Sequence, residues 1–155
     1  MKKMLCLFLS LSIFCGFTAT AYASGCVTHD SVEYLQDGSY FITTVMENSE
    51  IVVPLSITCS GSKTTAYYSK SGSKLWSVTV TGTFTYGSGS RAVCTKSTVS
   101  ANVYSSSWKI THSSASKSGN SASATATGTL YRNSTPIDSI TKTVTLTCSV
   151  NGNLS

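Results

Sequence analysis

WSVTVTGTFTY, residues 76–86, alternates apolar side chains with hydroxyl-bearing ones at every second position. Trp76, Val78 and Phe84 fall in the apolar register, and Thr79 and Thr83 fall in the other. Successive side chains of an extended chain point to opposite faces, so this stretch predicts a β-strand with one buried and one wet face. Threonine suits the wet face because its β-branch favours extended backbone while its hydroxyl stays hydrated.

The same alternation recurs along most of the chain and is interrupted by turn-forming Gly, Ser, Asn and Pro. We expect strands at residues 39–46, 50–60, 64–69, 75–86, 91–104, 107–115, 121–132 and 138–150. The only helix candidate is HDSVEYLQD, residues 29–37. Seven or eight strands separated by frequent turns predict an all-β fold, an antiparallel β-sandwich in preference to a closed barrel.

Three residues of the predicted sandwich are spaced as in an immunoglobulin domain. Cys94, Trp108 and Cys148 have about the spacing of the Cys-Trp-Cys core of immunoglobulin domains. However, Leu146 stands where such domains carry a tyrosine, and the seven residues after Cys148 leave no room for a final strand. We therefore expect immunoglobulin-like architecture at most.

Residues 1–23 have the pattern of a secretory signal peptide. The first three residues, MKK, are followed by an apolar run at 4–17 and by AYA at 21–23, which fits the cleavage pattern. The apolar run is about fourteen residues long, whereas a bilayer-spanning helix needs roughly twenty. We expect a secreted protein, with a lipid anchor on Cys26 as the lesser alternative. Residues 24–155 then form a single domain, in which an acidic segment at 24–50 precedes the β-sandwich at 51–155.

Four cysteines remain after the signal peptide, and an even number in an oxidising compartment predicts two disulfides. Three pairings are open. We favour Cys94 with Cys148, which lie at the beginning and the end of their strands. Cys26 would then pair with Cys59 and link the acidic segment to the predicted strand at 50–60.

Charge is distributed unevenly along the chain. The formal net charge is +5, and loss of Lys2 and Lys3 with the signal peptide lowers it to +3. Residues 24–50 hold five of the six acidic residues and no Lys or Arg, whereas residues 63–155 hold nine basic residues. Either the acidic segment folds against a basic sheet, or a basic face attracts a polyanion such as a teichoic acid or an anionic glycan. The few arginines of a secreted chain argue against nucleic acid.

Residues able to carry out catalysis are scarce. His29 and His112 are the only histidines, and no G-x-S-x-G nucleophile motif is present. A pair of carboxylates for glycoside cleavage would have to come largely from residues 30–50. The cysteines are too far apart in sequence to suggest a zinc site. We expect no enzymatic activity, no cofactor and no metal, with a glycan-active enzyme using the carboxylates of 30–50 as the alternative.

Aromatic side chains offer a better prospect, because flat rings on a β-sandwich suit stacking against sugars. We place five residues in a candidate binding surface: Tyr67, Tyr68, Tyr104, Trp108 and Tyr131. Trp76 is in register with Val78 and Val80 and is expected in the core, whereas Trp108 fits a core or a surface position equally well.

Rows of threonine offer another candidate surface. Thr79 to Thr85, Thr125 to Thr129 and Thr141 to Thr147 each repeat at every second residue, as in some ice-binding proteins. Sandwich sheets twist, and Ala122, Ala124 and Ala126 indicate packing on one of these strands. The rows are therefore interpreted as a solvated face, with ice binding as a further alternative.

Residues 75–155 resemble a family of short secreted, Ser/Thr-rich β proteins from Gram-positive, clostridia-like bacteria. The likeness is carried by the W-x-V-T-V-T-G-x-F-T-Y strand, by SASKSGN at 114–120, by Cys94 and Cys148, and by the ending CSVNGNLS. The resemblance implies secretion and a β-fold and assigns no functional residue. Taken together, the sequence predicts a secreted, non-enzymatic binding protein whose partner is an extracellular glycan or a cell-wall polyanion.

Overall fold

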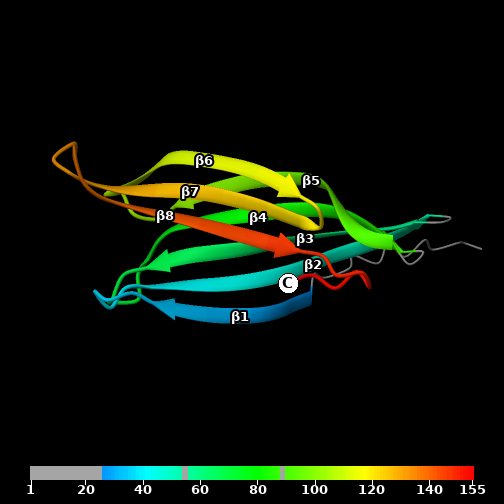
Figure 1. Cartoon of the computed structure of the whole chain (residues 1–155). Helices are drawn as coiled ribbons and strands as arrows, with labels where there is room; N and C mark the ends of the chain where they lie inside the picture. The colour runs from blue at the N-terminus through cyan, green and yellow to red at the C-terminus, as the bar shows by residue number, and fades with distance from the viewer. Residues whose placement is uncertain (1–25, 54–55, 88–89) are drawn as a thin grey trace, which may run out of the picture.

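The described residues form β-strands that assemble into two antiparallel sheets (Figure 1). The computed structural model describes residues 26–53, 56–87 and 90–155, and the side chains of 26–30, 48–53, 56 and 90 are outside that description. The strands are β1 Cys26–Tyr34, β2 Tyr40–Val53, β3 Ser56–Tyr68, β4 Lys74–Gly87, β5 Ser90–Val103, β6 Trp108–Ser118, β7 Ser121–Arg132 and β8 Thr135–Thr147. The described residues contain no helix, so the all-β, sandwich-like prediction is confirmed.

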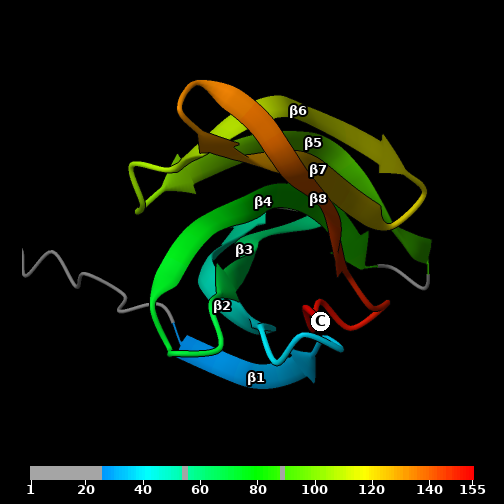
Figure 2. The same cartoon turned by 90° about the vertical axis from the view of Figure 1, so that its left-hand side faces the viewer.

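Each sheet is a simple meander in which every strand pairs with the next one in sequence. One sheet has the order β1-β2-β3-β4-β5, and the other has the order β6-β7-β8. Residues 104–107 connect β5 of the first sheet to β6 of the second. Figure 2 shows the three-stranded sheet over β4 and β5, while the five-stranded sheet curls away so that β1 lies at the far side. Immunoglobulin domains use Greek-key connections, so the likeness to them stops at the layered architecture.

The core forms between the inner faces of β4 and β7, because large side chains on β4 pack against small ones on β7. Trp76, Val78, Val80 and Phe84 on β4 are fully buried. The facing strand β7 carries four small residues inward along most of its length: Ala122, Ala124, Ala126 and Gly128. Alternating large and small side chains across facing strands fills the interior without voids. The predictions that Trp76 lies in the core and that the alanines are packing positions are confirmed.

The threonine rows lie on the outer faces of both sheets. Across β7 and β8, the Oγ1 atoms of Thr125 and Thr143 are 2.8 Å apart. On the other sheet, Thr64 on β3 and Thr79 on β4 make the same contact at 2.8 Å. Such cross-strand hydroxyl pairs stabilise a sheet by about 0.2–1 kcal/mol each. Figure 2 shows that both sheets are curved, so the rows do not form one flat array.

Three details of the sequence prediction are corrected. Residues 29–37 are not helical, because residues up to Tyr34 belong to β1, which pairs with β2. The predicted strand 50–60 is wrong, because residues 50–53 end β2 and residues 56–60 begin β3, which continues through the predicted strand 64–69 as far as Tyr68. Residues 26–50 provide β1 and most of β2, so the acidic segment is part of the five-stranded sheet. The predicted signal peptide lies outside the described residues.

No sulfur pair among the described side chains is at disulfide distance, and the favoured pairing of Cys26 with Cys59 does not match the strand order. Cys26 pairs in register with Glu47 on β2, which in turn pairs with Gly61 on β3. A whole strand therefore separates Cys26 from Cys59, and two strand spacings of about 4.8 Å exceed the Cα separation of a disulfide. The Sγ atoms of Cys59 and Cys148 lie 3.6 Å apart.

Candidate functional site

Two of the five predicted aromatic residues lie in the core. Trp108 is 6% exposed and Tyr67 is 4% exposed. Their rings meet edge to face with centroids 5.5 Å apart, and the Tyr67 hydroxyl donates a hydrogen bond to Ser39 Oγ at 3.0 Å. Trp108 directly follows the crossing between the sheets, and the chain turns its ring inward. The prediction that these two side chains belong to an exposed platform is wrong.

Tyr68 and Tyr104 instead belong to an aromatic row on the outer face of the five-stranded sheet. Register places Tyr34 opposite Tyr40, and Tyr40 opposite Tyr68. The rings of Tyr34 and Tyr40 have centroids 5.5 Å apart, and those of Tyr40 and Tyr68 are stacked at 5.2 Å. Lys74 pairs with Tyr68 in register, and its Nζ lies 4.2 Å from the centre of the Tyr104 ring. We call Tyr34, Tyr40, Tyr68 and Tyr104 the tyrosine row.

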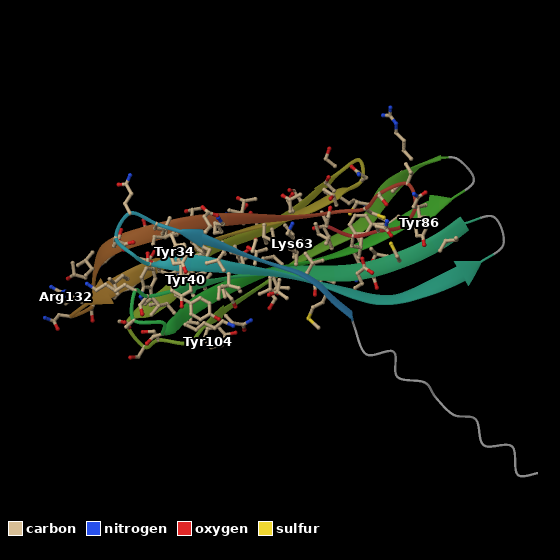
Figure 3. All side chains as sticks on the ribbon, turned by 90° about the horizontal axis from the view of Figure 1, so that it is seen from below. Tyr34, Tyr40, Lys63, Tyr86, Tyr104 and Arg132 are labelled. Carbon is tan, nitrogen blue, oxygen red and sulfur yellow. The ribbon has the colours of Figure 1, made fainter. Side chains whose placement is uncertain are left out.

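The tyrosine row runs across the strands near one end of the sheet. Figure 3 shows Tyr34, Tyr40 and Tyr104 in the same part of the molecule, with Tyr86 at the opposite end. Tyr34 is 74% exposed and Tyr104 is 53% exposed, while the two tyrosines between them are half-buried. A solvent-exposed tyrosine ring therefore lies at each end of the row. Tyr34 was missed because β1 was not predicted as a strand, and Tyr40, which lies in the predicted strand 39–46, was missed because only the pairing of β2 with β3 brings it beside Tyr68.

Polar groups modify the Tyr104 end of the row. The Tyr104 hydroxyl lies 3.4 Å from Ser77 Oγ. This contact, together with Lys74 beside the ring, holds the pKa of Tyr104 below its ordinary value. An ammonium group over the face of an aromatic ring is attracted to the electrons of the ring. Lys74 therefore brings a positive charge into the row.

The turns at the same end of the sheet add hydrogen-bonding groups. In the β1–β2 turn, Ser39 donates from its hydroxyl and its backbone N–H to Asp37 Oδ1 at 2.6 and 3.1 Å. These bonds lower the pKa of Asp37, so the carboxylate is ionised near neutral pH. In the β3–β4 turn, the hydroxyls of Ser69 and Ser71 are 2.8 Å apart. Exposed rings beside carboxylate and hydroxyl groups suit a ligand that has both apolar faces and hydroxyls.

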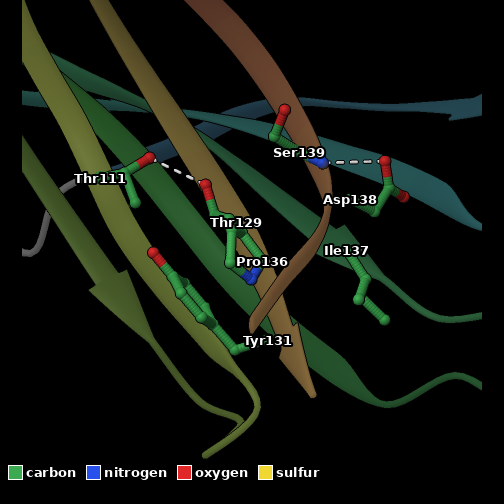
Figure 4. A pocket seen from close by; sticks show the side chains of 7 residues that line it. All are labelled: Thr111, Thr129, Tyr131, Pro136, Ile137, Asp138 and Ser139. Atoms are coloured by element: carbon green, nitrogen blue, oxygen red, sulfur yellow. Dashed lines mark hydrogen bonds between the residues drawn. The ribbon is translucent and has the colours of Figure 1, made fainter. Parts of the chain in front are cut away.

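Tyr131 lies on the other sheet and does not extend the tyrosine row. It lines a shallow hollow of about 530 Å³ on the three-stranded sheet, with Thr111, Thr129 and Asp138 among the neighbouring residues (Figure 4). The hydroxyls of Thr111 and Thr129 are 2.9 Å apart, and Asp138 accepts a hydrogen bond from its neighbour Ser139 at 2.8 Å. The polar groups of this hollow are thus largely engaged with one another.

The acidic and basic parts of the chain meet where β1 faces β8. Lys142 on β8 donates to the Glu33 carboxylate at 2.5 Å and lies 4.5 Å from the centre of the Phe41 ring. Lys142 and Lys63 also line a hollow of about 340 Å³. This contact agrees with the interpretation that the acidic segment folds against basic strands.

The described carboxylates of residues 30–50 have separate partners. Glu33 binds Lys142, Asp37 binds Ser39, and Glu47 accepts a hydrogen bond from the Leu154 backbone at 3.1 Å. The side chains of Asp30 and Glu50 lie outside the described residues. Within the part of the chain that the structure describes, no group of three or more His, Cys, Asp or Glu is placed to hold a metal ion. That part also contains no helix long and apolar enough to cross a membrane.

The chain matches no protein-family model, no curated protein and no solved structure in the three comparisons made. The resemblance of residues 75–155 to short secreted bacterial proteins stays a prediction. Arguments about function therefore rest on the geometry of the surfaces described above.

Proposed function

We propose that this protein is a secreted, non-enzymatic binding protein that holds an extracellular glycan against the tyrosine row. The observation that carries the proposal is the exposure of Tyr34 and Tyr104 at the two ends of the tyrosine row, in which Tyr34, Tyr40 and Tyr68 are in ring contact and Lys74 links Tyr68 to Tyr104. Large exposed apolar groups that adjoin one another usually mark a contact surface. Secretion and cross-linking by disulfides, both expected from the sequence, belong to the same proposal.

The chemistry of the row fits a sugar chain. A tyrosine ring offers an apolar face for the C–H side of a sugar and a hydroxyl for its polar edge. The row crosses the strands, which are about 4.8 Å apart, so it presents an extended track and not a single point. Asp37 and the serines of the β3–β4 turn lie at the same end and can accept or donate hydrogen bonds to sugar hydroxyls. Lys74 favours a glycan that carries acidic groups.

A glycan array probed with the purified protein, followed by calorimetric titration of the best oligosaccharide, tests this proposal. We expect Tyr34→Ala and Tyr104→Ala each to weaken binding about tenfold, which corresponds to about 1.4 kcal/mol. Tyr131→Ala is the matched control, because Tyr131 is a half-buried tyrosine beside Lys109 on the other sheet. It should leave the affinity unchanged.

Two results would overturn the proposal. One is the absence of binding to neutral and acidic glycans alike by a protein whose far-UV circular dichroism shows a folded β structure. The other is binding that Tyr131→Ala weakens and that Tyr34→Ala and Tyr104→Ala do not.

A further inference from the structure

Three cysteines converge at one end of the sandwich. Register places Cys59 on β3 opposite Phe84 on β4, and Phe84 opposite Cys94 on β5, so the three side chains lie in line on the inner face. Cys148 directly follows β8 and faces this line from the other sheet. All three cysteines are buried. The Sγ atoms of Cys59 and Cys148 are 3.6 Å apart, although 89 positions separate the residues in sequence.

The geometry excludes one pairing and distinguishes the other two. Cys59 and Cys94 have β4 between them, and two strand spacings exceed the Cα separation that a disulfide permits. Cys148 can therefore bond to Cys59 or to Cys94. The Cys94 sulfur points to its own strand, where the thiol donates to the Lys96 carbonyl at 3.3 Å. The Cys59 thiol also reaches a carbonyl oxygen, that of Gly152 at 3.7 Å, but its sulfur in addition contacts that of Cys148.

We propose that Cys59 and Cys148 form a disulfide that joins the two sheets. The S–S bond is about 2.05 Å long, so the sulfurs must approach by about 1.5 Å, which small side-chain rotations can supply. In the reaction the two thiols lose two protons and two electrons, and the sulfur–sulfur bond forms. A protein or small-molecule disulfide accepts them and is reduced to two thiols.

Burial indicates when this reaction takes place. Removal from water raises the pKa of the Cys148 thiol, which lowers the fraction of the reactive thiolate in the folded protein. The bond therefore forms while the sheets are still closing, and it is then shielded from reductants. Because β3 and β8 belong to different sheets, the cross-link limits how far the sandwich can open.

Peptide mapping of the wild-type protein, purified without reductant and alkylated in acid, tests the pairing. Trypsin alone leaves Cys26 and Cys59 in one peptide, because residues 24–62 contain no Lys or Arg. A second protease that cleaves after Glu50 separates them. We expect the peptide 51–63 to be linked to 143–155. A link between 143–155 and 92–96, or alkylation of both Cys59 and Cys148 after exposure to glutathione disulfide, would overturn the pairing.

Thermal unfolding gives a second, independent readout. Cys94→Ser is the matched control, since Cys94 is buried in the same line as Cys59. Reductant present throughout unfolding should lower the Tm of Cys94→Ser by about 10–20 °C, as for a bond that closes a long loop, and should not lower that of Cys59→Ser. Equal sensitivity of the two variants would contradict the proposal. If Cys59→Ser fails to fold, the peptide map of the wild-type protein still decides the pairing, whether or not any glycan binds.

Discussion

Tyr67 and Tyr68 show how one step along a strand separates a core residue from a surface residue. Both are on β3, yet Tyr67 packs against Trp108 in the interior while Tyr68 stacks on Tyr40 outside. Neighbouring side chains of a strand point to opposite faces, so two adjacent tyrosines cannot both join one platform. Burial has a chemical consequence for Tyr67, because removal from water raises the pKa of its hydroxyl.

We expect this pKa shift to make stability depend on alkaline pH. Below about pH 10, the ordinary pKa of tyrosine, Tyr67 is protonated in the folded and the unfolded chain. Above it the unfolded chain loses the proton first, so the free energy of unfolding falls as the pH rises toward the folded-state pKa. Urea titrations at pH 8 and pH 11 should show a larger loss for the wild type than for Tyr67→Phe.

The Tyr67→Phe substitution itself lowers stability, and the experiment includes a control variant. Tyr67→Phe removes the hydrogen bond to Ser39 and should cost about 1 kcal/mol at pH 8. Tyr34→Phe changes an exposed tyrosine and should follow the wild type at both pH values. Parallel pH dependence of the wild type and Tyr67→Phe would contradict the prediction.

At the scale of elements, β4 and β7 fit each other through complementary sizes. The bulky inward residues of β4 meet the inward Ala and Gly residues at 122–128 of β7. Gly128 is the closest approach, since a Cβ there would lie 2.5 Å from Trp76 Nε1. That indole nitrogen has no hydrogen-bond partner among the described residues, which makes the contact one of shape alone.

Gly128→Ala should therefore destabilise the protein by about 1–3 kcal/mol, the usual cost of overpacking a core. The Trp76 ring would have to move, and Phe41 and Tyr67 pack against it. Thr127→Ala on the outer face of the same strand is the control and should cost under about 1 kcal/mol. Denaturant unfolding measures both changes, and equal costs would show that β4 and β7 are not tightly fitted.

At the scale of the whole molecule, the curl of the five-stranded sheet leaves one side of the sandwich open. Residues 148–155 close that side. Leu154 is buried against Gly61 of β3, and its backbone N–H donates to Glu47 of β2. Thr147 and Ser155 exchange backbone hydrogen bonds at 2.9 and 3.1 Å. Gly152 has a φ of 87°, which glycine adopts without strain, and so allows the turn. This short segment connects β8 of one sheet to β2 and β3 of the other.

Leu154→Ala should lower the free energy of unfolding by about 2–4 kcal/mol, as for other truncations of buried leucine. Val150→Ala, in the same segment but exposed, is the matched control and should change stability by less than about 0.5 kcal/mol. Guanidinium unfolding followed by tryptophan fluorescence measures both. If Leu154→Ala left the free energy of unfolding unchanged, the segment would not contribute to closure of the sandwich.

Residue alternation by itself determined the all-β class, the buried face of β4 and the small-residue face of β7, because each follows from the period-two geometry of a strand. It did not reveal β1, whose residues do not alternate clearly and which is held by pairing with β2. Only the tertiary structure decided that Trp108 turns inward, that Tyr34 and Tyr104 end one aromatic row, and that the Cys59 sulfur contacts Cys148. Local pattern specifies the face of a strand to which a side chain points, whereas contacts between distant strands depend on their order in the sheets and on how the sheets close.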